Sequence, residues 1–535
     1  MSEASIASQF DRFGPAYRWL VTFAGIIGAI SVVLSATIVN VAVPSVMGAF
    51  GVEQGQAQWI ATAFIATMVA SQLMNAWVVA AFGERIAFCG LLALFTVGAV
   101  IAAASPNLEI LIAGRILQGF STGIIMPLVM SVMISVFPEN ERGFVIGMYG
   151  MGVTMAPGFG PFFGGLAIDL FSWRHMFLMP LGLVGLAFLM GLFLMPHRKF
   201  SRKLPSFNWS GYGLLIVALV CIMGGIGNGQ RWGWGSNATL LAFILGIASA
   251  IAFVISQLHV KNPLLDPTLF LNPQFASAVL LAFVFGAGAF ATNYAIPVFA
   301  QTIQGFTPTL AGAIIVPAGL LLLVLIPLSG KIADRVPNHI PIMCGCLMFA
   351  GSMYFIAEAD VNTAFWTIAL LVMVSRGGHG IVNPNMGKAA IGAVPADKIN
   401  RGVGTYNFIR QLGGAFGVNI IVVIMETRTA FHSEALTATQ TAGNPTSREF
   451  LDKVETILNQ SGVSEAVQHS GALNYLGKVI YAQAETLGFQ DAFTIIGWVF
   501  ILVLIPAWIL SRSRNRITLT SNAIPKPQGS GRPAE

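Results

Sequence analysis

Residues 152–165 read GVTMAPGFGPFFGG, and half of these fourteen positions are glycine or proline. The surrounding residues are apolar, so the stretch lies in a run long enough to cross a membrane as a helix. Recurring glycines leave a flat face that a second helix can approach closely, and prolines remove backbone hydrogen bonds and permit a kink. The stretch therefore predicts a membrane helix with a tight packing face formed by Gly152, Pro157, Gly160, Pro161, Gly164 and Gly165.

The composition of the whole chain also indicates a membrane protein. Only 9% of the 535 residues are charged and 55% are hydrophobic, whereas a soluble domain carries about 25% charged residues. A membrane helix needs about 20 mainly apolar residues, and the chain is predicted to be an all-α membrane protein. Fourteen runs meet the length, at residues 19–47, 56–81, 86–105, 109–136, 143–168, 175–195, 208–229, 237–258, 275–300, 309–329, 339–357, 362–387, 402–425 and 490–511.

The positions of lysine and arginine predict the orientation of the chain. With the N-terminus inside, 19 of the 28 lysines and arginines fall in inner loops and tails, and six fall in outer loops. Positive charge is retained on the cytoplasmic side, so we expect a multi-pass membrane protein with both termini in the cytoplasm. The net charge of +6 is then a topology signal, and no nucleic-acid partner is expected.

The pattern of spans divides the chain into five regions. The basic loop HRKFSRK at 197–203 separates the first six spans from the rest, and the polar segment 427–488 is expected outside the cytoplasm. That segment is either a solvated excursion or a docking surface for an external partner. The predicted regions are an N-terminal tail (1–18), a six-helix bundle (19–196), the basic loop with two additional helices (197–260), a second six-helix bundle containing the external segment (261–511), and a C-terminal tail (512–535).

Polar residues inside the spans are candidate cavity residues. Arg115 lies in GRILQGFSTG (114–123), a run with no other charge. A cation at the bilayer centre costs on the order of 2.5–3.5 kcal/mol on insertion scales, so it should face a polar cavity. The alternative is a structural arginine bound by backbone carbonyl groups. Ser35, Thr37 and Asn40, in LSATIVNVAVP (34–44), are predicted to line the same cavity.

Together these stretches resemble the major facilitator superfamily, and specifically its fourteen-helix drug:proton antiporter branch of EmrB-like multidrug efflux transporters. The glycine–proline stretch resembles the fifth-helix antiporter signature, and LIAGRILQGFSTG resembles the fourth-helix motif with Arg115 and Gln118. RGGHGIVNP (376–384) and NFIRQLGGAFG (407–417) resemble later helices of the family. The resemblance implies two six-helix halves, with two additional helices between them, that rock around a central cavity.

The resemblance also implies a cytoplasmic gate. GKIADR (330–335), with Gly330, Asp334 and Arg335, is similar to the second copy of the family's loop motif. The first copy is degenerate: it retains Gly83 and Arg85 but has alanines where charges are usual. Charge contacts of Asp334 and Arg335 are expected to lock this side. An ordinary solvated pair in a loop, which would contribute little, is the alternative.

Two positions depart from the family pattern. Ser35 stands where EmrB-like sequences usually carry the aspartate expected to carry the proton, and Asn208 stands where an acid is usual. Serine cannot carry a proton. His379 lies in mid-span and titrates near physiological pH, so it is either another carrier or a neutral histidine bound by a neighbouring helix. Arg376 and Arg410 are further embedded cations, which leads to the hypothesis that the cavity prefers anionic or zwitterionic amphiphiles.

The predicted function is secondary active export of drug-like or amphipathic compounds, driven by proton influx. The alternatives are a dedicated exporter of one endogenous metabolite (a siderophore, fatty acid or aromatic acid) and a facilitator or sensor that has lost proton coupling. The seven histidines show no metal-ligand or nucleophile spacing, so neither an enzyme nor a cofactor is expected. Expected partners are the substrate, protons, lipid and, by the resemblance, a periplasmic adaptor with an outer-membrane channel.

Overall fold

The computed structural model describes residues 3–138, 141–197, 205–260, 263–395, 398–441, 443–508 and 510. Within these ranges every regular element is a helix. Most of the basic loop 197–203 and the whole tail 512–535, both named above, lie outside the described residues, as do the side chains of Asp334 and Arg335.

The N-terminal half contains the first six predicted spans, after the short helices α1 (Glu3–Phe13) and η1 (Gly14–Ala16). Its helices are α2 (Tyr17–Ile38), η2 (Val39–Ala42), α3 (Val43–Phe50), α4 (Gln54–Ala57), α5 (Trp59–Gln72), α6 (Asn75–Phe82), α7 (Glu84–Ala103), α8 (Leu108–Val136), α9 (Arg142–Leu170), α10 (His175–Leu178) and α11 (Leu181–Leu194).

Two additional helices and the C-terminal half follow. The additional pair is α12 (Trp209–Trp232) and α13 (Asn237–His259), and the side chain of Asn208 caps α12 by accepting a hydrogen bond from Gly211 N–H. The helices of the C-terminal half are η3 (Pro267–Leu271), α14 (Pro273–Thr302), α15 (Pro308–Ala313), α16 (Val316–Arg335), α17 (His339–Ile356), α18 (Phe365–Gly392), α19 (Ile399–Ala438), α20 (Pro445–Gln460) and α21 (Glu465–Leu502).

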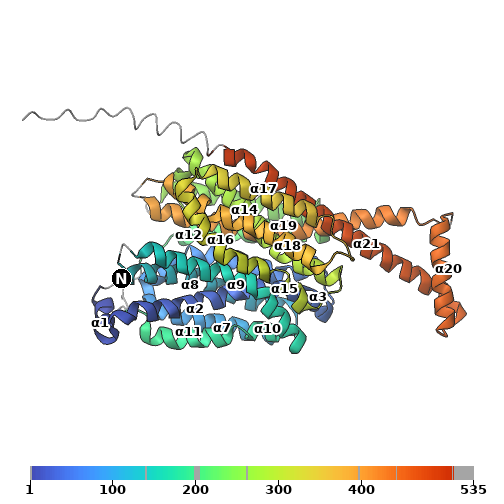
Figure 1. Cartoon of the computed structure of the whole chain (residues 1–535), viewed down its shortest axis with the longest axis horizontal. Helices are drawn as coiled ribbons and strands as arrows, with labels where there is room; N and C mark the ends of the chain where they lie inside the picture. The colour runs from blue at the N-terminus through green and yellow to red at the C-terminus, as the bar shows by residue number, and fades with distance from the viewer. Residues whose placement is uncertain are drawn as a thin grey trace, which may run out of the picture.

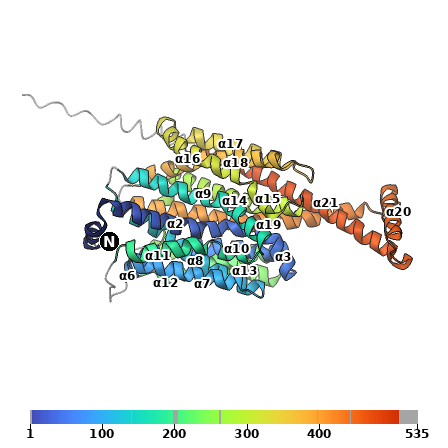
Figure 2. The same cartoon turned by 60° about the horizontal axis from the view of Figure 1, so that its bottom comes forward.

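The described helices match the span count expected for the fold. Thirteen are long and apolar enough to cross a membrane, and there are fourteen if the pair Gln54–Gln72 and Asn75–Phe82, bent by 62°, forms one span. Figure 1 shows the two halves as adjacent layers of roughly parallel helices, and Figure 2 shows the same bundle after a turn of 60°. The all-α membrane fold predicted from the sequence is confirmed.

The first predicted span, 19–47, is interrupted in the structure. α2 ends at Ile38, and the four residues of η2 follow before α3 begins at Val43. Pro44 has no backbone N–H and cannot continue the i→i−4 ladder of α2, so the chain tightens into a 3₁₀ turn just before it. This break places the Asn40 side chain off the regular helix, where it donates to the backbone carbonyl of Asn293 on α14 at 3.1 Å.

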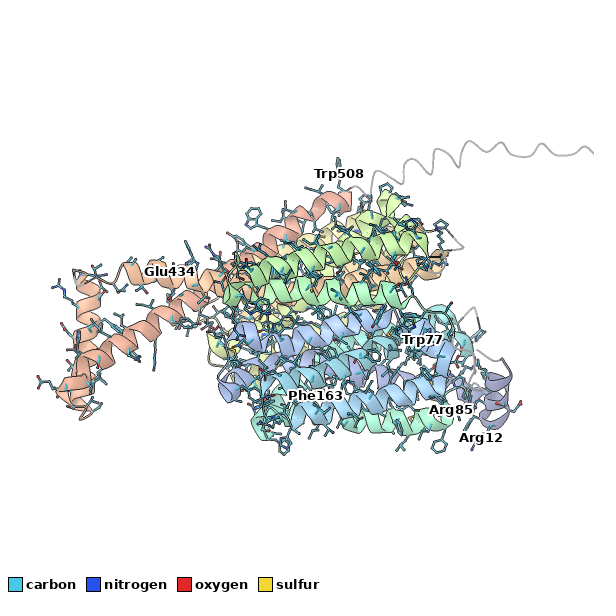
Figure 3. The ribbon with its side chains drawn as sticks, turned by 180° about the vertical axis from the view of Figure 1, so that it is seen from behind. Arg12, Trp77, Arg85, Phe163, Glu434 and Trp508 are labelled. Atoms are coloured by element: carbon cyan, nitrogen blue, oxygen red, sulfur yellow. The ribbon has the colours of Figure 1, made fainter. Side chains whose placement is uncertain are left out.

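The polar segment 427–488 consists largely of extensions of two spans. α19 continues to Ala438, beyond the predicted end at 425, and α21 begins at Glu465, well before the predicted start at 490. α20 joins them and packs on α21 through stacked rings of Phe450 and Tyr475, 6.0 Å apart. The extension projects from one end of the bundle (Figure 1), which we call the α20 end. In Figure 3 Glu434 lies on it, while Arg12 and Arg85 lie at the opposite end, called the Arg85 end.

Of the two additional helices, α12 lies across the seam between the halves. Asn419 on α19 donates from Nδ2 to the backbone carbonyl of Met223 on α12 at 2.8 Å. On the same helix, a Cβ built at Gly227 would meet both Asn419 and Trp59, so α12 contacts the C-terminal half through one residue and α5 through the other. Helix α12 therefore contacts both halves and belongs structurally to neither one alone.

Candidate functional site

Arg115 on α8 is bound entirely within the N-terminal half. Its side chain is fully buried. Nε donates to the Ile60 carbonyl at 2.9 Å, and Nη1 donates to Ser35 Oγ at 3.0 Å and Gln118 Oε1 at 2.9 Å. The guanidinium also lies 4.1 Å from the centre of the Phe64 ring, a favourable cation–π distance. These residues, with Arg115, are called the Arg115 cluster, and all of its acceptors are neutral.

Glycines of the GRILQGFSTG stretch hold α8 against its neighbours. A Cβ at Gly114 would meet the backbone of α7 at Gly98, 2.7 Å from its carbonyl oxygen. A Cβ at Gly119 or Gly123 would meet the carbonyl oxygens of Phe64 and Met68 on α5. The resulting close approach carries Arg115 to α5 and α2, where Nε and Nη1 find acceptors, while Nη2 has no partner among the described residues.

Arg376 on α18 has a comparable set of neutral partners in the C-terminal half. It is 5% exposed. Nη2 donates to Asn293 Oδ1 at 2.7 Å and to Thr292 Oγ1 at 3.1 Å, both on α14, while both terminal nitrogens lie 3.3–3.4 Å from the Ala289 carbonyl. Its Nε has no hydrogen-bond partner among the described residues.

The His379–Asn383 pair and Arg410 lie beside Arg376 in the same cavity wall. Asn383, one turn along α18, places its Nδ2 2.8 Å from His379 Nε2. When this amide donates, the neutral imidazole carries its hydrogen on Nδ1, and Nδ1 has no partner in the described part of the chain. Arg410 on α19 makes no hydrogen bond or ion pair to a described residue and lines the cavity directly.

A cavity of about 150 Å³ lies between the two halves. Drug-sized ligands usually occupy roughly 300–1,000 Å³, so a ligand of that size requires the halves to move apart. Its described lining comes from α2, α5, α8, α9, α14, α16, α18 and α19 and consists of Val33, Ala36, Thr37, Met68, Met126, Val153, Pro157, Gly158, Gly286, Ala289, Phe290, Asn293, Ile315, Gly319, Leu322, Arg376, His379, Asn383, Arg410 and Gln411.

The two walls of this cavity differ in chemistry. The described lining from the N-terminal half is apolar except for Thr37, whose hydroxyl donates to its own helix at Leu34. The C-terminal half contributes every charged or amide side chain of the described lining, from Asn293 to Gln411. No aspartate or glutamate is among these lining residues. The cavity is therefore amphipathic, with a net positive wall on one side.

The glycine–proline stretch of α9 seals the cavity toward the α20 end. On one face, a Cβ at Gly160 or Gly164 would meet α2 at Thr37 and Ile38. On the other face, a Cβ at Gly165 would meet the backbone of α15 at Pro308. Gly312 of α15 is in equally close contact with the Pro161 carbonyl, and Gly158 with Gly319 of α16. The stretch thus lies between the two halves and packs against both.

Two carboxylates complete this seal, one from each half. Asp169 at the end of α9 accepts a hydrogen bond from Thr309 N–H of α15 at 2.9 Å. Glu426 on α19 accepts one from the backbone N–H of Gly55 on α4, and a Cβ at Gly55 would lie 2.5 Å from the Glu426 carboxylate oxygen. We call Asp169 and Glu426 the latch carboxylates. The contacts of both latch carboxylates join the two halves on the side of the cavity nearer the α20 end. The hydrogen bond between Asn40 and Asn293 joins the halves on the same side.

The structure separates the residues predicted to share one cavity. Thr37, Arg376, His379 and Arg410 line it. Ser35, Arg115 and Gln118 are absent from its described lining, because they are hydrogen-bonded to one another in the Arg115 cluster. Asn40 is likewise drawn into the seal. The described lining of the cavity in this state therefore contains four of the eight candidate cavity and coupling residues, Thr37, Arg376, His379 and Arg410.

The predicted cytoplasmic gate residues that are described make no contact between the halves. Gly83 has φ 78°, a backbone conformation that favours glycine, and forms the turn between α6 and α7. Arg85 donates from Nε to the Met195 carbonyl at 2.8 Å, within the N-terminal half. Gly330 lies in α16 with open space around it, and the side chains of Asp334 and Arg335 lie outside the described residues.

Sequence reasoning missed several polar residues of the site. Thr292 and Asn293 are a polar pair within a span that has no charge, the same signal that identified Ser35, Thr37 and Asn40. Asn383 follows His379 at helical spacing, and Gln411 follows Arg410 directly. Asp169 and Glu426 each directly follow the last residue of a predicted span, but their role in the seal depends on contacts between distant segments.

Comparisons with known proteins agree with this architecture. A family model described as Major Facilitator Superfamily matches residues 25–418. The multidrug export protein EmrB of Haemophilus influenzae is 27% identical over 496 residues, covering 91% of this chain and 95% of that protein. The fatty acid resistance protein FarB of Neisseria gonorrhoeae is 26% identical over 510 residues, covering 93% and 96%.

A solved structure shows the same fold. The crystal structure of a POT family transporter in complex with a thioalcohol-conjugated peptide superposes with a TM-score of 0.65 at 15% identity, covering 95% of this chain and 99% of that one. The resemblance that the motifs carried is confirmed by these matches.

Proposed function

The chain belongs to the Major Facilitator Superfamily, and on that premise we propose that it exports drug-like or amphipathic small molecules by alternating access, driven by proton influx. That it is a multi-pass membrane transport protein and not an enzyme follows from the family and its relatives. The observation that supports the proposal best is the amphipathic cavity between the halves, closed toward the α20 end by contacts that cross between them.

We propose that residues 19–196 and 261–511 move as two bodies around this cavity. The bacterial inner membrane, with the α20 end outside and both termini in the cytoplasm, is the location that the charge distribution supports. In this orientation the described state is closed to the outside. The projecting α19–α20–α21 extension is where a periplasmic adaptor would bind, as the match to EmrB and its relatives suggests.

The latch carboxylates offer a route for protons to act on the outer seal. A carboxylate accepts a backbone hydrogen bond more strongly than a protonated carboxyl group does, because the charge strengthens the bond. Protons arriving from outside would therefore weaken the contacts of Asp169 with Thr309 and of Glu426 with Gly55, and favour opening. Glu53 lies near Glu426 and adds negative charge there.

Transport by purified protein in lipid vesicles tests the proposal. A fluorescent amphiphile should move across the membrane, and the rate should respond to an imposed pH gradient. Asp169→Asn and Glu426→Gln, which keep shape but cannot titrate, should reduce that response, whereas Glu434→Gln on the exposed extension should not. His379→Ala, measured in the same assay, reports whether a cavity group carries the proton instead.

A second candidate function is a facilitator without proton coupling. It is favoured by one observation: among the described residues that line the cavity, none is an aspartate or glutamate. Transport that ignores the pH gradient in wild-type vesicles would support this function, and absence of any transport would contradict both. A dedicated exporter of one metabolite remains the alternative on substrate breadth, which a panel of unrelated amphiphiles would resolve.

A further inference from the structure

We propose that the cavity binds organic anions with an apolar tail, the head group on the C-terminal wall and the tail on the N-terminal wall. This inference rests on the proposed export function but not on proton coupling. It assigns the head-group site to Arg410, His379 and the exposed side of Arg376, none of which is satisfied by a charged partner within the described residues.

Unused hydrogen-bond donors define the head-group site. The Arg410 guanidinium binds no described side chain, Arg376 keeps a free Nε, and His379 keeps a free Nδ1. A buried donor without a partner costs about 1–3 kcal/mol, and more when it is charged. A carboxylate, sulfonate or phosphate group supplies several acceptors at once. An anion that enters beside Arg410 as the halves part can pair with these donors, whereas a cation or a neutral head group leaves them unpaired or is repelled.

The charges that line the cavity independently favour an anionic ligand. Two guanidinium groups line the cavity, and the partners of Arg376 are the neutral groups of Ala289, Thr292 and Asn293. Uncompensated positive charge in a low-dielectric site repels a cationic ligand and attracts an anionic one. The Arg115 cluster does not offset this positive charge, because the acceptors of Arg115 are neutral and Arg115 is itself a third cation in the bundle.

The opposite wall fits a hydrocarbon or aromatic tail. Val33, Ala36, Met68, Met126 and Val153, all from the N-terminal half, face the cavity. Methionine side chains are flexible and polarisable and adapt to tails of different shape. Since head and tail are held by different halves, rocking of the halves loosens one set of contacts while the other persists.

An anionic substrate also provides its own coupling to the membrane potential. With the cell interior negative, outward movement of one negative charge gains about 2.3 kcal/mol per 100 mV. That corresponds to a concentration ratio of about 50 at equilibrium. Export of a permanent anion can therefore run uphill even without a titrating group in the cavity. The serine at position 35 is then compatible with active export.

Binding of matched probes tests the site. We would use three dansyl-labelled alkyl chains of one length that end in a sulfonate, a trimethylammonium or a methoxy group, with full-length protein in nanodiscs. The sulfonate should bind at least tenfold more tightly than the trimethylammonium. Arg410→Gln should weaken sulfonate binding about tenfold, the loss expected for one charge-assisted hydrogen bond, and should leave methoxy binding unchanged. Arg448→Gln, on the exposed surface of α20, is the matched control.

Transport of the same probes separates this inference from the proposed function. In vesicles with a potassium diffusion potential and equal pH on both sides, the sulfonate should move toward the positive side, and reversal of the potential should reverse the movement. Vesicles that transport the trimethylammonium probe in preference would overturn the anion site while leaving an exporter. Vesicles that transport no probe would overturn the proposed function itself. Unchanged sulfonate binding by Arg410→Gln would remove the head-group site.

Discussion

Arg115 and Arg376 occupy comparable places in the two halves but have different surroundings. Each lies on the fourth span of its half and reaches the first span, Arg115 at Ser35 on α2 and Arg376 at Asn293 on α14. Arg115 is fully buried and is absent from the described lining of the cavity, whereas Arg376 shares the cavity wall with Arg410. One half thus uses its arginine for packing, and the other half keeps its arginine where a ligand can reach it.

This difference teaches that a buried cation in a membrane helix is not by itself a ligand site. A charge within a membrane span is unfavourable, and this cost applies equally to both arginines. What separates them is whether the side chain lines the cavity and whether a second cation lies beside it, since each keeps one nitrogen without a partner among the described residues, Nη2 of Arg115 and Nε of Arg376. The following variants test that distinction, in order of decreasing effect.

Arg115→Ala should cause the largest loss of stability. The substitution leaves the Ile60 carbonyl, Ser35 and Gln118 without their donor and creates a void beside Phe64. Unpaired buried groups and a cavity together cost roughly 3–5 kcal/mol. Thermal unfolding in detergent should show a large fall in Tm and a low yield of folded protein. Arg448→Ala, on the surface of α20, should unfold like the wild type.

A folded and stable Arg115→Ala protein that no longer transports any probe would contradict this assignment. It would place Arg115 among the ligand-binding residues and make the two halves more alike than the structure indicates. Measurement of probe binding by the same preparation would identify which of the two roles has been lost.

Ser35→Ala should have the next largest effect. It removes one neutral acceptor from a charged donor at 3.0 Å, and a hydrogen bond to a charged group contributes about 1.5–3 kcal/mol. The loss should appear as a lower Tm with an unchanged affinity for the sulfonate probe, because Ser35 is absent from the described cavity lining. Ser35→Asp should recover the stability at neutral pH, since the introduced carboxylate would face Arg115. A lower affinity of Ser35→Ala for the sulfonate probe would contradict this prediction, because it would show that the Arg115 cluster reaches the substrate.

Much of this fold could be predicted from the sequence, because span length and the glycine–proline stretch are local signals. The sequence also identified Arg115, Arg376 and Arg410 as buried. It could not establish which way each one faces, since the rotation of α8 depends on the glycine contacts of Gly119 and Gly123 with α5. Contacts such as that of Asn40 with Asn293 join segments 253 residues apart, and no periodicity within either segment encodes them.

Arg376→Gln should separate binding from stability in the C-terminal half. A glutamine retains a donor for Asn293, so the free energy of unfolding should fall by only about 1–2 kcal/mol. Affinity for the sulfonate probe should fall at least tenfold, because the uncompensated charge beside Arg410 is lost. Titration of the probe into nanodiscs, with Tm measured on the same sample, checks both values. A loss of stability as large as that of Arg115→Ala would erase the contrast between the halves.

The smallest effects are expected at the Arg85 end, where each half has an ion pair. In the C-terminal half Asp266, with its side chain 5% exposed, binds Lys398 at 3.0 Å and accepts a hydrogen bond from the Thr268 hydroxyl. In the N-terminal half Arg18 binds Glu141 at 3.1 Å, and both side chains are substantially exposed. Asp266→Asn should lower the free energy of unfolding by about 1 kcal/mol, and Glu141→Gln by less, because exposed pairs contribute little.

The pH dependence of the Asp266→Asn variant sharpens the contrast. Burial raises the pKa of Asp266, but the hydrogen bonds from Thr268 and the charge of Lys398 outweigh it, so the net pKa is lowered. A carboxylate whose pKa is lower in the folded state stabilises the protein above its unfolded pKa, about 3.9, and loses that contribution as pH falls through the folded pKa. The difference in Tm between the wild type and Asp266→Asn should therefore be constant from pH 7 to pH 5 and should shrink below about 4. A difference that grew on acidification would mean that Asp266 is destabilised by burial and that its ion pair does not anchor α19.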